Sequence, residues 1–263
     1  MALYDLTTTQ LVRKFLDENP TRVQFTADDV VGWFAVHYPK TKESTIRAHL
    51  LKLATNVATR VYYKAKPGQD DMLFRIAPGL FRRYDPAKDP PPIRVGDVSG
   101  PIPRATVAER TVASEENEWP RPDAAEVGSS EFAYEHHLRD FLARDVTKLE
   151  PGLRLYESEG IPGVEYPIRN RRMDLLCVGK DGALVVVELK VSKGHDRVLG
   201  QILTYMGWVR ADIADGKPVR GMIVASAMSD EIKTAIRESK ADVKLFEYEL
   251  SFALRSVDPA APS

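Results

Sequence analysis

Residues 172–190, RMDLLCVGKDGALVVVELK, form two apolar stretches joined by a turn sequence, and charged residues interrupt both stretches. The pattern is typical of two neighbouring buried strands. Asp174 lies in the first stretch, and Glu188 and Lys190 lie at the end of the second. Burying a carboxylate in such a strand is costly unless it is paired or binds a cation. Because Glu188 and Lys190 are two residues apart, their side chains leave the same face of the strand.

Two carboxylates and an ammonium in this arrangement suit the hydrolysis of a phosphodiester. Carboxylate oxygens are hard ligands that hold Mg²⁺ and leave positions for water and a phosphate oxygen. An ammonium on the same face can steady the attacking water or the developing negative charge. We therefore expect Mg²⁺ as the cofactor, with Mn²⁺ able to replace it.

The spacing of these residues, Asp-(13 residues)-Glu-x-Lys, resembles the PD-(D/E)XK nuclease signature. In HDRVLGQILTYMGWV, Gln201 and Tyr205 are four apart and share one face of a predicted helix. Members of this superfamily related to the NucS mismatch endonucleases and the RecB group use such a Gln-x-x-x-Tyr pair beside the metal. They also place a glutamate on the first helix, where EHHLRDFLARD offers Glu135. The resemblance covers about residues 131–254.

The resemblance implies a restriction-endonuclease-like α/β core with a mixed central sheet. It also implies roles for six residues: metal ligation by Asp174 and Glu188, with Glu135 completing the site, activation of water by Lys190, and positioning by Gln201 and Tyr205. Hydrolysis would leave a 5′-phosphate and a 3′-hydroxyl.

One position departs from the family pattern, which often has glycine two residues before the aspartate. Here that position is Arg172, in the basic run 169–172 with Arg171, and we expect both arginines near the substrate backbone. The alternative is structural: Asp174 as a surface residue near a turn, and Glu188 with Lys190 as an exposed pair at a strand end. Agreement of five residues in order, on the right element types, favours the nuclease.

The periodicity of the second half predicts the order α-β-β-β-α-β-α-β, which matches the nuclease core. The expected elements are a helix at 131–148, strands at 164–168, 173–178 and 183–189, a helix at 197–213, a strand at 219–225, a helix at 229–239 and a strand at 243–250.

The first half predicts three short helices, which begin near the capping residues Thr7, Thr26 and Ser44. A hairpin at 59–65 and 72–76 and a short strand at 80–84 follow. This is the order of a winged helix-turn-helix domain, whose third helix enters the DNA major groove.

Basic charge is concentrated in residues 1–84, which hold 13 lysines and arginines against 8 aspartates and glutamates. Such an excess is expected of a surface that binds nucleic acid. We expect contacts with bases from Thr45, Arg47 and His49, and contacts with phosphates from Lys42, Lys52, Arg60 and Lys64. The alternative is a domain for protein interaction or dimerisation, with these charges on a solvated face.

The chain is thus predicted to be an α+β protein of two domains, at 1–84 and 131–254. Proline-rich and partly acidic sequence at 85–130 predicts a linker, extended enough to hold the domains tens of ångströms apart at about 3 Å per residue. The tail at 255–263 is predicted to be disordered.

Composition excludes several classes of protein. The chain has 263 residues, 43% of them hydrophobic and 29% charged, and no apolar run of about 18 residues that would span a membrane. No secretory signal is visible, so we expect a cytoplasmic protein. The single cysteine, Cys177, excludes disulfides within the chain and cysteine-zinc sites. The sequence has no phosphate-binding glycine loop, so no nucleotide cofactor is expected.

These observations predict a Mg²⁺-dependent endonuclease acting on double-stranded DNA. Cutting both strands requires two active sites, so a homodimer is expected. A role in restriction or defence is favoured, because the first domain is unlike the β-rich partner domain of the mismatch endonucleases. The alternatives are a mismatch- or structure-specific repair endonuclease, an enzyme acting on RNA or branched DNA, and a non-catalytic DNA-binding regulator.

Overall fold

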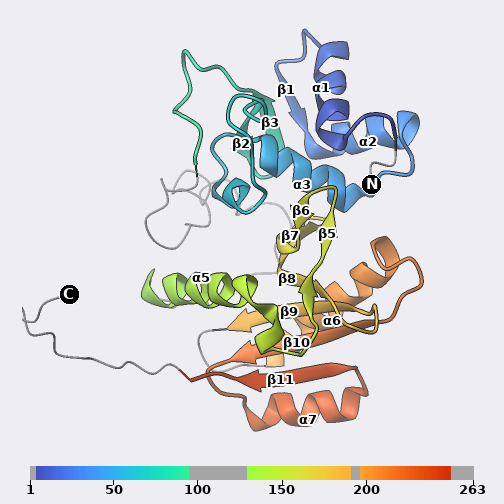
Figure 1. Ribbon diagram of the computed structural model, residues 1–263, viewed down its shortest axis with the longest axis vertical. Helices are drawn as coiled ribbons and strands as arrows, with labels where there is room; N and C mark the ends of the chain where they lie inside the picture. The colour runs from blue at the N-terminus through green and yellow to red at the C-terminus, as the bar shows by residue number, and fades with distance from the viewer. Residues whose placement is uncertain (1–3, 95–128, 191–195, 250–263) are drawn as a thin grey trace, which may run out of the picture.

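The computed structural model describes residues 4–94, 129–190 and 196–249, with side chains from 135 and 198 onward in the second and third ranges. These residues form an N-terminal unit and a C-terminal unit, each with its own sheet (Figure 1). The predicted α+β class is confirmed. Most of the predicted linker, at 95–128, and the predicted tail, at 255–263, lie outside the described residues.

The N-terminal unit combines three helices with a small antiparallel sheet of order β1-β3-β2. Its elements are α1 (Thr8–Glu18), β1 (Gln24–Thr26), α2 (Ala27–His37), α3 (Glu43–Leu53), the 3-10 helix η1 (Ala58–Val61), β2 (Leu73–Ala77) and β3 (Leu80–Arg83). Capping boxes begin α1 and α2 as predicted, because Thr7 pairs with Gln10 and Thr26 pairs with Asp29.

Two predictions for this unit are wrong. The segment predicted as a strand at 59–65 begins with the 3-10 helix η1, and the hairpin is formed by β2 and β3 instead. The third helix begins at Glu43, with Lys42 at the N-cap and no side-chain capping bond, so Ser44 lies inside the helix. β1 was missed because three residues are too few to show an alternating pattern.

The C-terminal unit is built on a mixed sheet of order β11-β10-β9-β8-β4, with β7 also paired to β8. Its longer elements are α5 (Ser129–Arg144), β7 (Val164–Ile168), β8 (Arg171–Val178), β9 (Leu184–Lys190), α6 (Asp196–Asp212), β10 (Val219–Ala225), α7 (Asp230–Ser239) and β11 (Val243–Glu247). These agree with the predicted order. Four short elements were not predicted: η2 (Val146–Lys148), β4 (Arg154–Leu155), β5 (Glu157–Ser158) and β6 (Ile161–Pro162).

Helices cover both faces of this sheet, so its central strands β8, β9 and β10 are buried on both sides. α5 and η2 contribute Leu142 and Val146 to a cluster on one face. α6 and α7 contribute Ile202, Tyr205 and Ile232 to a larger cluster on the other. Two-sided burial explains why β8, β9 and β10 read as continuous apolar runs in the sequence.

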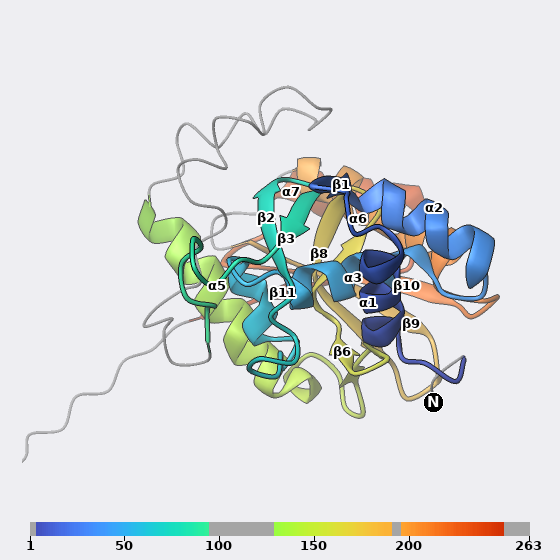
Figure 2. The ribbon, with the colours of Figure 1, turned by 90° about the horizontal axis from the view of Figure 1, so that it is seen from above.

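Helix α3 joins the two units. It packs against β6 and β7, and the ribbon shows it between the two units, on the side of the N-terminal unit that faces the larger sheet (Figures 1 and 2). Ala48 of α3 and Tyr63 are fully buried in the same apolar cluster as Tyr166 and Ile168 of β7. Lys42 Nζ also donates hydrogen bonds to Ile213 O at 2.7 Å and Asp215 Oδ2 at 2.5 Å. The sequence predicts a linker long enough to let the domains act tens of ångströms apart, whereas in this structure the two units pack directly against each other.

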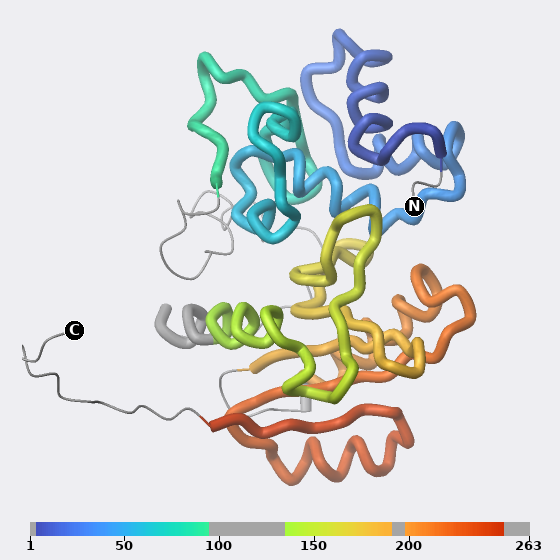
Figure 3. Tube along the Cα trace, viewed as in Figure 1, coloured from blue at the N-terminus to red at the C-terminus, as the bar shows by residue number. Residues whose placement is uncertain are grey.

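The beginning of the predicted linker follows the surface of the N-terminal unit (Figure 3). Ile93 N donates a hydrogen bond of 2.9 Å to Thr55 O, and Arg94 forms two hydrogen bonds with Asp71. Residues 85–94 are thus attached to this unit by named contacts. No helix in the described ranges is long and apolar enough to cross a membrane.

Candidate active site

Asp174 and Glu188 occupy facing positions on two paired antiparallel strands. The paired register of β8 and β9 runs to Leu175 opposite Val187, and the two carboxylates are the next residues on each strand. Both are buried, with 3% and 2% of their surface exposed. The strand register therefore places these two predicted site residues next to each other.

Glu188 is held by two donors through one of its oxygens. Its Oε1 accepts hydrogen bonds from Gln201 Nε2 at 2.6 Å and from Lys190 Nζ at 3.0 Å. Its Oε2 is buried, and no described residue donates a hydrogen bond to it. Burial and the nearby charge of Asp174 raise the pKa of Glu188 to about 8. A cation bound nearby would therefore stabilise the ionised form of this buried carboxylate.

Lys190 lies among the carboxylates. Its ammonium is 3.0 Å from Glu188 and 3.8 Å from Oε1 of Glu135, which α5 brings to this end of the sheet. Burial lowers the pKa of Lys190, but the charges of Glu188, Glu135 and Asp174 outweigh burial and raise it above its ordinary value. The amine is thus held as a cation beside the carboxylates.

Gln201 and Tyr205 come from α6, one helical turn apart, and reach the same site. Gln201 Nε2 also donates to Tyr205 Oη at 3.3 Å, and Tyr205 Oη donates to the backbone oxygen of Arg172 at 3.1 Å. Asp174 Oδ2 accepts a hydrogen bond from the Leu189 amide at 2.9 Å. The structure therefore brings all six predicted residues to one end of the sheet.

The donor set fits a divalent cation in part. Asp174 and Glu188 supply buried oxygens of the type that Mg²⁺ and Mn²⁺ prefer, and Glu188 Oε2 has spare acceptor capacity. The described part of the chain holds no group of three His, Cys, Asp or Glu side chains placed to bind one metal ion. Glu135 is not brought into such a group, and it contacts Lys190 instead.

The basic turn before Asp174 is ordered by contacts with α6 and β7. The Arg169 and Arg171 guanidinium groups lie over the Trp208 ring, at 5.2 and 5.6 Å from its centroid. Arg172 is 3.3 Å from Glu165. Of the two arginines predicted to contact DNA, Arg172 is therefore engaged in an internal ion pair, and Arg171 stacks on a half-buried ring.

Most of the residues predicted to contact bases or phosphates are buried or paired in this structure. Thr45 and His49 are 3% and 2% exposed, because their face of α3 is covered by the C-terminal unit. Burial lowers the pKa of His49. The predicted DNA contacts by these two side chains are inconsistent with this packing.

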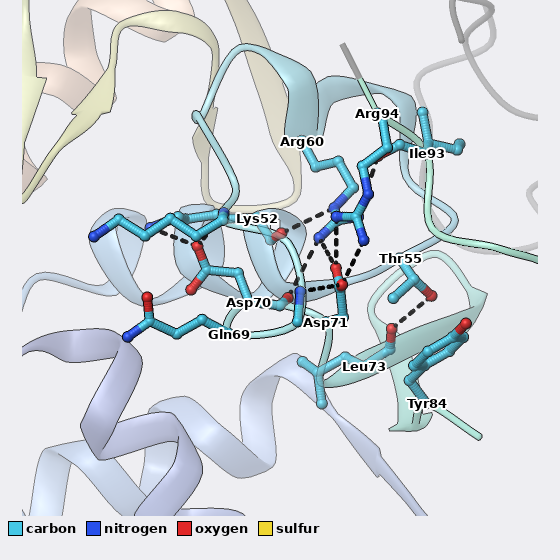
Figure 4. Close-up of polar contacts among 12 residues, drawn as sticks. Lys52, Thr55, Arg60, Gln69, Asp70, Asp71, Leu73, Tyr84, Ile93 and Arg94 are labelled. Carbon is cyan, nitrogen blue, oxygen red and sulfur yellow. Dashed lines mark hydrogen bonds and ion pairs between the residues drawn. The ribbon is translucent and has the colours of Figure 1, made fainter. Parts of the chain in front are cut away.

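Arg60 and Lys52 are also engaged within the N-terminal unit (Figure 4). Arg60 is fully buried and donates to Asp71 Oδ1 at 2.6 Å, and Lys52 Nζ is 3.4 Å from the buried carboxylate of Asp70. The prediction that Arg60 meets a phosphate is therefore inconsistent with its burial. From η1, its side chain thus connects the end of α3 at Lys52 O, the loop before β2 at Asp71 and the later segment at Ile93 O.

Arg47 and Lys64 are predicted DNA contacts on the N-terminal unit that retain access to solvent. Arg47 is paired with Glu43 at 2.7 Å and with Asp28 of α2. Lys64 is exposed and lines, with Arg144 and Tyr156, a cavity of about 400 Å³ between the units. Neither residue lies among the carboxylates of the candidate site.

Sequence reasoning missed a second buried charged cluster, formed by Arg139 and Glu165, which are 2% and 1% exposed. They form an ion pair, and Arg139 also contacts Tyr62 of the N-terminal unit at 2.7 Å. The glutamate inside the apolar strand VEYPI was the same kind of signal that singled out Asp174.

The C-terminal unit combines a mixed sheet, covered by helices on both faces, with two buried acids on facing strands. Comparison with known families finds similarity over this half of the chain. Residues 134–256 match the family described as endonuclease NucS C-terminal domain. Residues 7–83 match a domain of unknown function, DUF7669. The C-terminal unit is therefore similar to the nuclease domain of endonuclease NucS.

Individual relatives match over the same half. Endonuclease NucS from Frankia alni is 30% identical over 129 residues, which are 49% of this chain and 54% of the relative. The Corynebacterium glutamicum enzyme is 31% identical over 124 residues, 47% of this chain and 49% of the relative. The chain therefore spans about half the length of the curated relatives it matches. Among solved structures, a repair endonuclease from Pyrococcus abyssi is 23% identical with a TM-score of 0.37, covering 47% of this chain and 48% of its own.

Proposed function

We propose that this chain is a divalent-metal-dependent DNA endonuclease that hydrolyses phosphodiester bonds at the site formed by Asp174, Glu188 and Lys190. The observation that carries the proposal is the pair of buried carboxylates on facing strands, with an ammonium 3.0 Å from one of them. Similarity of residues 134–256 to the NucS nuclease domain supports the same chemistry.

Asp174 and Glu188 would hold the metal, Mg²⁺ or Mn²⁺, which supplies charge for the phosphate oxygens and lowers the pKa of water when bound. Lys190 orients the attacking water or stabilises the negative charge that develops on the phosphate. Gln201 fixes Glu188, and Tyr205 fixes Gln201 through its hydroxyl. The products would carry a 5′-phosphate and a 3′-hydroxyl.

A repair role is better supported than the restriction role favoured by the sequence. The relatives that match the C-terminal half are endonuclease NucS proteins, and one similar structure is described as a repair endonuclease. We therefore infer that the substrate is double-stranded DNA with a mismatch or another structural irregularity. A homodimer would supply the two sites needed to cut both strands.

The N-terminal unit has the element order α-β-α-α-β-β and the sheet order β1-β3-β2, which support its assignment as a winged helix. Its third helix is covered by the C-terminal unit, so a DNA contact through that helix is not part of the proposal. Exposed or half-exposed cations, Lys64 and Arg171 among them, are the proposed contacts with the DNA backbone.

The test is cleavage by the purified full chain with Mg²⁺ or Mn²⁺ of supercoiled plasmid and of labelled duplexes, matched, mismatched, methylated, branched or of RNA. Glu188→Gln, which keeps the side-chain shape, is the matched control. Cleavage of mismatched duplex by the unchanged chain, and not by Glu188→Gln, supports the repair role. Cleavage restricted to matched or methylated duplex supports restriction. No cleavage of any substrate, with retained DNA binding, supports the non-catalytic regulator instead.

A further inference from the structure

Glu165 lies opposite Asp174 across a pair of strands. In the register of β7 and β8, Val164 pairs with Leu175 and Tyr166 pairs with Met173, so Glu165 occupies the position that faces Asp174. Its φ of +48° is in the left-handed region, which a residue with a side chain adopts at a cost in free energy. Such a conformation persists only where the surrounding structure fixes it.

The N-terminal unit supplies the contact that fixes this backbone. Tyr63, which is fully buried, donates a hydrogen bond of 2.9 Å from its hydroxyl to Glu165 O. Tyr63 lies just after η1, and its ring packs in the same apolar cluster as Tyr166 and Ile168. A residue of one unit therefore holds the strained position beside a proposed metal ligand of the other.

The side chain of Glu165 extends this connection to both neighbouring elements. Its carboxylate pairs with Arg139 of α5 and with Arg172 of β8, two residues before Asp174. Arg139 in turn donates to Tyr62 Oη at 2.7 Å, and Tyr62 Oη donates to Asp140 Oδ1 at 2.7 Å. A buried ion pair of this kind is costly to disturb, because removing a partner leaves a charge without compensation.

Strand β8 is also connected by hydrogen bonds to Glu188, the second carboxylate of the candidate site. Tyr205 Oη donates to Arg172 O, Gln201 donates to Tyr205 Oη, and Gln201 also donates to Glu188. Contacts therefore run without interruption from the two tyrosines of the N-terminal unit to the site on β8 and β9.

We propose that Tyr62 and Tyr63 are positioning residues of the nuclease site, and that the N-terminal unit serves to fix strand β8 and its Asp174. This inference rests on the proposed function and adds a role for the N-terminal unit that does not depend on reading DNA bases. It also fits the burial of one face of α3, because that face packs on β6 and β7, while Tyr62 and Tyr63, which follow η1, contact α5 and β7.

The experiment compares the full chain with Tyr63→Phe and Tyr62→Phe, each of which removes one hydroxyl and keeps the ring. Tyr38→Phe is the matched control, since its hydroxyl accepts a hydrogen bond of 3.0 Å from Lys14 on the same unit, away from the interface. Three quantities are measured: kcat and KM for the best DNA substrate, hydrogen exchange of residues 164–175, and the melting temperature.

We expect Tyr63→Phe to lower kcat about 10-fold, the effect typical of losing a contact that orients a metal ligand, with KM changed less than about twofold. Exchange at residues 164–175 should become faster, and Tyr62→Phe should act in the same direction. Tyr38→Phe should leave kcat and this exchange unchanged.

Wild-type kcat in both interface variants, or an equal loss in Tyr38→Phe, overturns the inference. A general loss of folding would appear as faster exchange throughout the chain, and it too contradicts a positioning role. If the unchanged chain cuts nothing, the proposed function fails, and exchange at residues 164–175 in Tyr63→Phe then decides by itself whether the tyrosine fixes this strand.

Discussion

Gln201 of α6 donates a hydrogen bond of 2.6 Å to Oε1 of Glu188 on β9, and Oε2 of the same carboxylate is left buried without a donor among the described residues. The amide thus fixes the plane of the carboxylate and directs one oxygen to the protein. The other oxygen remains available for a cation. One oxygen of this carboxylate thus bonds to the protein, while the other can bind a metal ion.

Loss of this amide should weaken metal-dependent activity. We expect Gln201→Ala to lower cleavage about 10- to 100-fold, because groups that orient a metal ligand typically contribute that much. Raising the Mn²⁺ concentration should restore part of the loss. Thr204→Ala is the control on the same helix, since the Thr204 hydroxyl bonds to Gly200 O instead of the site. Equal activity in both variants would remove Gln201 from the site.

Lys190 should affect the chemical step more than DNA binding. Lys190→Met keeps the length of the side chain and removes the ammonium that lies 3.0 Å from Glu188. We expect kcat to fall about 100- to 1000-fold, as on loss of one donor that stabilises transition-state charge, with KM nearly constant. Rapid-quench measurement of a single turnover would check the step. A variant in which KM rises and kcat holds would assign Lys190 to substrate binding.

The buried ion pairs around Asp71 should set part of the acid stability of the N-terminal unit. Burial raises the pKa of Asp71, but hydrogen bonds from Arg94, Arg60 and the Gly68 amide outweigh burial and lower it to about 2. Because the pKa of Asp71 is lower in the folded state than its ordinary value of 3.8, the stabilisation is complete above about pH 4 and is lost as pH falls toward 2.

Asp71→Asn should therefore destabilise the chain by about 3 kcal/mol at neutral pH, because it leaves Arg60 buried without its carboxylate. The difference from the unchanged chain should shrink below about pH 4 in urea titrations. Lys88→Ala, at an exposed pair with Asp85, is expected to change stability by less than about 0.5 kcal/mol. A difference that stays constant down to pH 2 would contradict the assigned cause.

Arg171 should contribute to DNA binding through charge alone. Its guanidinium lies over Trp208 beside the candidate site, so it is held in place to meet a phosphate. We expect Arg171→Ala to weaken binding equally for all sequences and to reduce the slope of log K against log salt by about 1. Arg60→Ala should leave that slope unchanged in the folded fraction. An unchanged slope in Arg171→Ala would exclude the phosphate contact.

The two units should unfold together. Ala48→Asp places a charge in the shared cluster, where Ala48 is fully buried against β7, and should cost several kcal/mol. We expect one calorimetric transition in the unchanged chain and two in this variant. Val36→Asp, at an exposed position on α2, is the control and should keep one transition. Two transitions in the unchanged chain would show that the units unfold separately.

The candidate site was predictable because its signals are local. Asp174 and Glu188 stand out as charges in apolar strands, and Gln201 and Tyr205 follow helical spacing, so each signal needs only a few neighbouring residues. Pairing of β8 and β9 follows from the tight turn between them, which sets the register that brings the acids together.

The docking of the two units was not predictable because it depends on contacts between residues far apart in the sequence. The outer face of α3 carries Thr45 and His49, polar residues that read as a solvated or DNA-facing surface. In the structure Thr45 Oγ1 lies 3.0 Å from Ser158 Oγ, and His49 Nδ1 lies 2.9 Å from Thr45 O. Small polar residues that satisfy one another can be buried at an interface, and no periodicity distinguishes that case from exposure.

Because α3 packs into the cores of both units, neither unit can be exchanged for another domain without exposing buried apolar surface. Removal of residues 4–94 would uncover Tyr166 and Ile168, both fully buried, and would strip the donor from Glu165 O. Joining the C-terminal unit to a different N-terminal domain would therefore require a replacement for this helix surface as well as a new linker. We therefore expect the two units to be retained together during evolution.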